Sequence, residues 1–123
     1  MRIALAILMA LHGVAHMVGF AGSWQLAATT EMPYKTTVLG GNLDLGDAGI
    51  RVVGVLWALA ALAFVTVSGA TALDKPWWPT AAVIVALASM ALTLVELPQA
   101  RVGLVVNLAL IATLLFARRL GVV

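Results

Sequence analysis

The only two histidines of this chain, His12 and His16, lie four residues apart within an apolar stretch of membrane length. Between Ile3 and Phe20 the chain has no acidic residue, no lysine and no arginine. Ionisable side chains at membrane depth are costly, and they usually face the interior of a helical bundle, a water-filled cavity or a binding site. The histidine pair is therefore the first candidate for chemistry in this sequence.

Three kinds of chemistry fit two histidines at this spacing. In the plainest, both rings hydrogen-bond to serine, threonine or asparagine side chains and only hold helices together. In a catalytic alternative, His16 and Glu96 exchange protons as a paired acid and base. Histidines at positions i and i+4 also suit a shared metal ion, but Glu96, Asp44 or Asp47 would have to complete that site. No metal motif supports such a set, so we expect no metal.

The composition excludes several classes of protein. Of the 123 residues, 63% are hydrophobic and 10% are charged, which is too apolar for a soluble domain of this size. The chain has no cysteine, so disulfides and thiolate metal sites are excluded. The net charge is +2 and the basic residues are scattered, whereas a nucleic-acid partner requires a basic patch. The lipid bilayer is the expected partner.

Four continuous apolar segments are each close to the roughly 20 residues that a helix needs to cross a bilayer. None alternates with the period of two that a membrane barrel requires, so helices are expected. The sequence predicts an all-α, polytopic membrane protein, an antiparallel bundle of four transmembrane helices in a single domain, 1–123. The expected helices are 2–24, 49–71, 77–97 and 101–116, with a long first loop over 25–48.

The distribution of basic residues predicts the orientation. Lysine and arginine concentrate in cytoplasmic loops. With a cytoplasmic N-terminus, the inner side holds Arg2, Lys75, Arg118 and Arg119, and the outer side holds Lys35, Arg51 and Arg101. Arg51 and Arg101 begin helices and can belong to a buried network, and leaving them out makes the count four against one. We expect a multi-pass protein of the inner membrane with both termini in the cytoplasm.

The connections differ in character. Trp77 and Trp78 follow a tight turn and are typical of an interfacial anchor, and Pro79 suits a first helical turn. The short link 98–100 predicts a helical hairpin. The first loop is longer than the roughly 12–15 residues that structureless loops usually reach. It could cap the bundle, but we expect a plain solvated loop.

Small and polar residues recur on one face of each predicted helix at steps of three and four, as expected of packed membrane helices. These faces are expected to point to the centre of the bundle. The predicted inward residues are His12, His16, Gly19 and Ser23; Arg51, Gly54, Ala58, Ala61, Val65 and Ser68; Ala82, Ala86, Ser89, Thr93 and Glu96; and Gly103 and Asn107.

Nearly all of this intramembrane polarity falls in the half of the bundle beneath the first loop. Glu96 is expected to pair with Arg51 or Arg101 at the membrane interface, and Asn107 to hydrogen-bond between helices. The candidate catalytic residues are His12, His16 and Glu96. The candidate ligand pocket adds Ser23, Arg51, Ser89, Thr93, Arg101 and Asn107.

Three stretches of the sequence resemble a group of small four-helix bacterial membrane proteins that are often grouped loosely with the DoxX-like proteins. They are 11–20 (LHGVAHMVGF), 54–57 (GVLW) and 99–107 (QARVGLVVN). The glycine-rich opening usual in DoxX itself is not evident here. The resemblance implies a four-helix fold and, for DoxX relatives, an association with membrane redox complexes. It supplies no catalytic residues.

The first hypothesis for function is a polar intramembrane pocket that binds a lipid-soluble small molecule, or an accessory subunit of a membrane complex such as a redox complex. An alternative is a membrane enzyme that uses His and Glu acid–base chemistry on a quinone-like or isoprenoid-like substrate. A further alternative is an oligomeric transporter or channel, although no inverted repeat or broken helix supports it. A homo-oligomer or a membrane-complex partner fits these hypotheses, and the sequence leaves the cofactor and enzymatic activity open.

Overall fold

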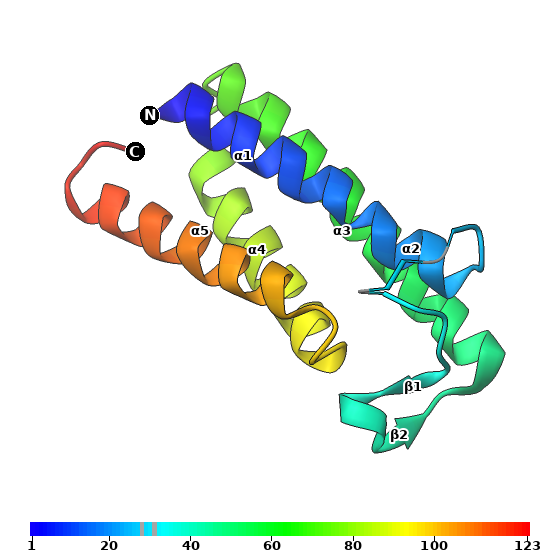
Figure 1. The fold of residues 1–123 in the computed structure, drawn as a ribbon. Coiled ribbons are helices and arrows are strands. Elements are labelled where there is room, and N and C mark those ends of the chain that lie inside the picture. Colours follow the sequence, from blue (N-terminus) through cyan, green and yellow to red (C-terminus); the bar gives the residue numbers. More distant parts are fainter. Residues whose placement is uncertain (28, 31) are drawn as a thin grey trace.

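The computed structural model describes residues 1–27, 29–30 and 32–123, and its long helices run antiparallel in sequence order (Figure 1). The first span, Arg2–Ser23, consists of α1 (Arg2–Ala15) and α2 (Met17–Ser23). It is followed by α3 (Gly46–Ala72), α4 (Trp78–Val95) and α5 (Arg101–Arg119). All four spans are long and apolar enough to cross a membrane. The prediction of an all-α, four-helix membrane bundle is confirmed.

The regular hydrogen-bond pattern of the first span is interrupted at His16, although the backbone there keeps helical dihedral angles. The backbone N–H of His16 lies between two acceptors, 3.1 Å from the Gly13 carbonyl and 3.3 Å from the His12 carbonyl. The His16 imidazole also bonds to the His12 carbonyl oxygen, with its Nδ1 at 2.7 Å. A side chain that bonds to the carbonyl one turn earlier competes with the backbone N–H for that acceptor.

The first loop is shorter and more structured than expected. α3 begins at Gly46, three residues before the predicted start. A small antiparallel hairpin precedes it, with β1 (Thr37–Val38) and β2 (Leu43–Asp44) joined by the short helix η1 (Leu39–Gly41). Val38 is buried against residues of α3, so this segment packs on the bundle. The expectation of a plain solvated loop is wrong for the hairpin.

The backbone N–H of Gly46 donates to the Asp44 carboxylate, which lowers the pKa of Asp44. The Tyr34 hydroxyl donates to Asp47 in the first turn of α3, and this bond raises the pKa of Tyr34. Gly46 has a φ of 68°, a left-handed conformation that glycine adopts without steric cost. These contacts fix where the loop ends and α3 begins.

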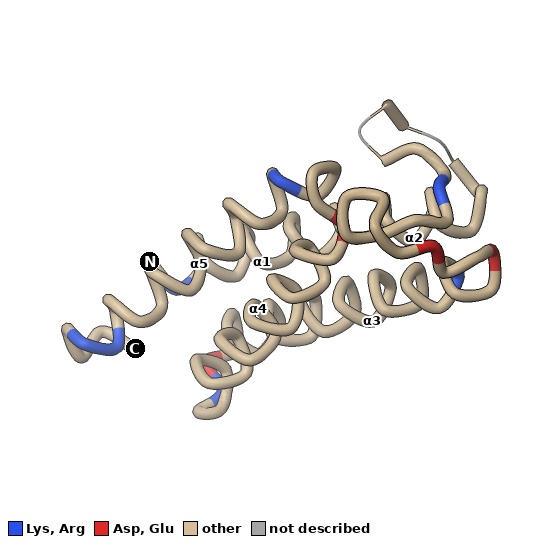
Figure 2. The backbone as a smooth tube through the Cα atoms, turned by 90° about the horizontal axis from the view of Figure 1, so that it is seen from below, with Lys and Arg blue, Asp and Glu red and all other residues tan. Residues whose placement is uncertain are grey.

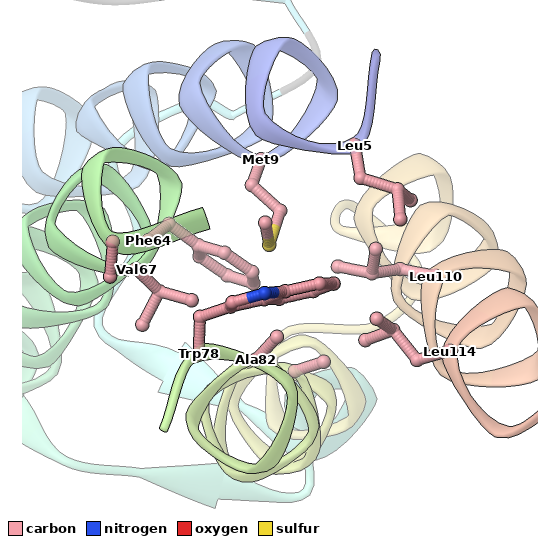
Figure 3. Close-up of a cluster of buried hydrophobic side chains, with 10 residues drawn as sticks. Leu5, Met9, Phe64, Val67, Trp78, Ala82, Leu110 and Leu114 are labelled. Carbon is pink, nitrogen blue, oxygen red and sulfur yellow. The ribbon is translucent and has the colours of Figure 1, made fainter. Parts of the chain in front are cut away.

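An apolar core fills the half of the bundle opposite this loop, and side chains from all four spans surround the indole of Trp78 (Figure 3). Trp78 is buried whereas Trp77 is exposed, so only one of the two tryptophans fits the predicted interfacial anchor. The small side chains of Ala82 and Ala86 on the same helix are fully buried and leave room for larger neighbours. The other members of this core are Leu5, Met9, Phe64, Val67, Ala70, Leu110 and Leu114.

The predicted inward faces are confirmed for the first and third spans and partly wrong for the second. Every predicted residue of the first and third faces is buried, as are Gly54, Ala61 and Ser68 of α3. Arg51 and Val65 are instead exposed. The face of α3 that points inward is formed by larger residues, among them Trp57 and Phe64, because glycines of the first span face them.

Candidate functional site

The two histidines belong to a closed set of hydrogen bonds that joins three helices. His12 Nε2 lies 2.9 Å from Asn107 Oδ1 on α5, and Asn107 Nδ2 lies 2.8 Å from Ser89 Oγ on α4. Ser89 Oγ lies 2.6 Å from His16 Nε2, and His16 Nδ1 returns to the His12 carbonyl at 2.7 Å. We refer to these four residues as the histidine ring. All four are at least nine-tenths buried.

The direction of each hydrogen bond follows from the His12 carbonyl oxygen, which can only accept. The His12 carbonyl accepts, so His16 carries its proton on Nδ1, and a neutral His16 then accepts at Nε2 from the Ser89 hydroxyl. The Asn107 amide N–H donates to Ser89 Oγ, which leaves Asn107 Oδ1 to accept from His12 Nε2–H. With both rings neutral, every bond of the histidine ring has one donor and one acceptor.

This arrangement leaves one imidazole nitrogen uncommitted. Three of the four imidazole nitrogens of His12 and His16 take part in the hydrogen bonds that join these four residues. The fourth, His12 Nδ1, is then an acceptor that has no partner among the described residues. His12 itself lines the large cavity described below.

Aromatic packing fixes the orientation of both imidazoles. The His12 and His16 rings meet edge to face with centroids 4.6 Å apart. The Phe64 ring lies 4.9 Å from His12 and 5.2 Å from His16, and the Trp57 ring lies 5.2 Å from His16. Gly13 makes the close approach of α1 and α3 possible, because a Cβ at Gly13 would lie 2.7 Å from the Phe64 Cβ. The histidine ring is therefore held rigidly from two sides.

A cavity of about 900 Å³ lies beside the histidine ring, between the first span and α5. His12 and His16 form part of its wall, and the first loop and the link before α5 close its end. Most of the lining is apolar, and Arg101 lies at the start of α5. The lining residues are Leu8, His12, Ala15, His16, Val18, Gly19, Thr29, Thr30, Met32, Trp57, Pro98, Gln99, Ala100, Arg101, Val102, Gly103 and Val106.

Two residues that line this cavity each have one occluded polar atom with no partner among the described residues. These atoms are the indole Nε1 of Trp57 and the amide oxygen Oε1 of Gln99, a donor and an acceptor, both buried. Buried polar groups without a hydrogen bond are uncommon in folded proteins. Sequence reasoning missed both residues as candidates. The signal for Trp57 was present, because Trp57, Ala61 and Phe64 follow one another at steps of four and three.

Glu96 lies apart from the histidine ring. Its Oε2 is 3.6 Å from Nζ of Lys35, a residue of the first loop, and its side chain is only 4% exposed. The expected pairing of Glu96 with Arg51 or Arg101 is therefore wrong. Burial raises the pKa of Glu96, which follows the last residue of α4, and the Lys35 ammonium offsets this only in part. Glu96, Lys35 and Ser23 line a separate, small cavity of about 10 Å³.

Two of the remaining predicted pocket residues, Arg51 and Thr93, line neither cavity. Arg51 is exposed at the start of α3, with its Cζ 5.5 Å from the centroid of the Trp24 ring. Thr93 is buried between helices, where its hydroxyl donates to the Met90 carbonyl at 2.8 Å. Of the nine predicted site residues, the histidine ring brings together His12, His16, Ser89 and Asn107, and only Arg101 of the others lines the large cavity.

The chemistry available here is that of neutral polar groups next to an apolar space. No cluster of three or more histidine, cysteine, aspartate or glutamate side chains suited to a metal ion occurs within residues 1–27, 29–30 and 32–123. His12 offers a bare nitrogen at the cavity wall, and the other three members of the histidine ring hold that imidazole in place. No family model, no curated protein and no solved structure matches the chain.

Proposed function

We propose that this chain is a multi-pass protein of the bacterial inner membrane that binds a lipid-soluble small molecule in the cavity beside the histidine ring. The observation that supports this most is the cavity itself, about 900 Å³ of mainly apolar space with His12 and His16 in its wall. Small-molecule sites typically enclose roughly 300–1,000 Å³, with an apolar lining and a few fixed polar groups. The binding candidates are quinone-like and isoprenoid-like compounds.

A ligand dissolved in the bilayer has a direct route to this space. Leu8, Val18 and Val102 line the cavity, and each is at least 40% exposed on a helix surface that would meet hydrocarbon. The route therefore runs between the first span and α5, without crossing the charged ends of the bundle. A water-soluble ligand would have to enter past the first loop instead.

The proposed orientation places both termini in the cytoplasm. Figure 2 shows charged residues near the end that holds both termini and, on the other side, around the first loop and the start of α5, whereas the helix interiors carry none. Four basic residues and Asp74 lie near the end that holds both termini, and Arg2 forms a salt bridge with Asp74 there. An excess of lysine and arginine favours the cytoplasmic side. The cavity then opens in the outer half of the membrane.

The enzyme alternative receives less support. It needs an acid near His16, and Glu96 was the candidate for that role. Glu96 is paired with Lys35 and lines the other, smaller cavity. We therefore place binding ahead of acid–base catalysis.

Binding can be tested with a cavity-filling variant and a neighbouring control. Val106 lines the cavity, whereas the adjacent Val105 is 65% exposed on the outer face of the same helix. Purified protein in detergent is titrated with decylubiquinone and with farnesol, and tryptophan fluorescence reports saturation. We expect Val106→Trp to weaken binding at least about tenfold, equivalent to about 1.4 kcal/mol, and Val105→Trp to leave it unchanged.

Circular dichroism of both variants checks that the helices remain folded. The proposal fails if the wild-type protein binds neither compound saturably. It also fails if folded Val106→Trp binds as tightly as the wild type, because the bound compound would then lie elsewhere.

A second candidate function is that of an accessory subunit of a membrane redox complex. The resemblance to small four-helix proteins grouped with DoxX favours it, and so does an apolar groove of about 490 Å³ between α3 and α4. Four alanines line this groove, and small residues allow membrane helices to approach closely. The alanines are Ala60, Ala63, Ala88 and Ala91. Co-purification of a specific membrane partner after mild detergent extraction, lost in Ala88→Trp, would support this role.

A further inference from the structure

The bare nitrogen of His12 restricts what the cavity can recognise. The histidine ring fixes Nε2–H of His12 on Asn107 at 2.9 Å, so a neutral His12 presents only a lone pair at Nδ1. His12 lines the large cavity, and its ring makes a hydrogen bond to the described residues only through Nε2. A ligand satisfies this atom only if it donates a hydrogen bond.

We infer that the occupant of the cavity is an alcohol or phenol on an apolar skeleton, with its hydroxyl donating to His12 Nδ1. This inference rests on the proposed function and specifies the head group of the ligand. Ketones, aldehydes, ethers and esters only accept hydrogen bonds, so they leave the lone pair unmatched.

Charged head groups fit the inner part of the cavity less well. A carboxylate or phosphate facing His12 Nδ1 would bring two acceptors together and would lose its hydration in a mainly apolar space. An ammonium group could donate, but it would pass Arg101, which lies at the start of α5 in the cavity wall. A hydroxyl is neutral, and it donates and accepts.

Asn107 acts here as a positioning residue. It holds His12 in the tautomer with a bare Nδ1, through the bond to Nε2–H. In Asn107→Leu nothing on α5 selects this tautomer, and a His12 that carries its proton on Nδ1 can donate to an ether as well. The variant is therefore expected to lose selectivity between donor and acceptor ligands, which is a different effect from a general loss of affinity.

The test uses five probes that share one isoprenoid skeleton: farnesol, its methyl ether, the aldehyde farnesal, farnesoic acid and the hydrocarbon farnesene. Their dissociation constants are measured for the purified full chain in detergent. We expect farnesol to bind about three- to tenfold tighter than the ether, the aldehyde and the hydrocarbon, the range expected of one net hydrogen bond. Asn107→Leu should reduce the ratio of ether to alcohol dissociation constants toward one, and Thr113→Ala on the same helix should retain it.

Nitrogen NMR of histidine-labelled protein gives a readout that does not depend on a variant. His12 Nδ1 should show the shift of an unprotonated nitrogen in the free protein, and farnesol should move it toward the hydrogen-bonded value. A protonated Nδ1 in the free protein would overturn the inference.

Some binding results would overturn the inference about the head group and leave the proposed binding function standing. That is the case if farnesal or the methyl ether binds as tightly as farnesol. It is also the case if farnesoic acid binds most tightly and loses this advantage in Arg101→Gln, because the site would then recognise an anionic lipid. If none of the five probes binds saturably, both the proposed function and the inference are wrong.

Discussion

Replacing Asn107 by leucine tests whether the histidine ring stabilises the bundle. The change keeps a side chain of similar size but removes the acceptor of His12 Nε2–H, at 2.9 Å, and the donor to Ser89 Oγ, at 2.8 Å. Hydrogen bonds between membrane helices contribute about 0.6 kcal/mol on average and at most about 1.7 kcal/mol each. The unpartnered N–H of His12 adds a desolvation cost. We therefore expect Asn107→Leu to lower the free energy of unfolding by about 1–3 kcal/mol.

Reversible unfolding in mixed micelles of a mild detergent and dodecyl sulfate, followed by circular dichroism, measures this loss. Thr113→Ala serves as the control on the same helix. Thr113 is exposed and its hydroxyl bonds only to the Ala109 carbonyl one turn earlier, so a change below about 0.5 kcal/mol is expected.

A double-mutant cycle with His12→Leu isolates the bond between the first and last helices. A coupling energy of about 0.6–1.7 kcal/mol between His12 and Asn107 is expected. Purely additive effects, or an Asn107→Leu loss no larger than that of Thr113→Ala, would refute the reasoning that these buried contacts stabilise the fold.

Three further predictions concern packing, charge and orientation. Gly13→Ala should lower the free energy of unfolding by about 1–3 kcal/mol, because its Cβ would lie 2.7 Å from the Phe64 Cβ. The control Gly69→Ala would meet nothing within 4 Å and should be neutral. Equal effects of the two changes on unfolding in micelles would contradict this prediction. The folded-state pKa of Glu96 is raised, so ionisation of Glu96 lowers the stability of the native state as the pH rises above the ordinary pKa of 4.5. Glu96→Gln should therefore gain stability relative to the wild type between pH 4 and 7. Parallel stability profiles of the variant and the wild type over this pH range would count against the prediction. The chain has no cysteine, so Asn42→Cys should react with an impermeant maleimide in intact cells and Lys75→Cys only after lysis; the reverse pattern would invert the proposed orientation.

The sequence predicts the fold and the inward faces of the first and third spans because those faces consist of small or polar residues at helical spacing. His12, His16 and Ser89 stand out against an apolar background, and residues three or four apart on a helix share a face whatever packs against them. This local regularity is enough to place them at the centre of the bundle.

The face of α3 could not be predicted in the same way, because its packing depends on partners far along the chain. Large residues such as Trp57 and Phe64 can face a neighbouring helix only where that helix is small, and Gly13 and Gly19 provide the space. Trp57 then becomes part of the cavity wall. A rule that seeks small residues on every inward face misses this complementarity between a small face and a large one.

The partner of Glu96 was equally beyond the sequence. Arg51 and Arg101 were reasonable candidates because they begin helices at the same end of the bundle. The choice of Lys35 depends on the first loop folding back over the bundle, with Val38 buried against α3. Loop conformation of this kind is set by tertiary contacts and leaves little periodic signal.

The bond between His12 and Asn107 also has a consequence for how the protein is made. The two residues are separated by 95 positions, so His12 is synthesised and inserted long before its partner exists. At about 5–20 residues per second, the wait is roughly 5–20 s. Throughout that time the nascent chain lacks the Asn107 acceptor of the His12 N–H. The last helix therefore completes the hydrogen bonds of the centre, because Asn107 supplies the partners of both His12 and Ser89.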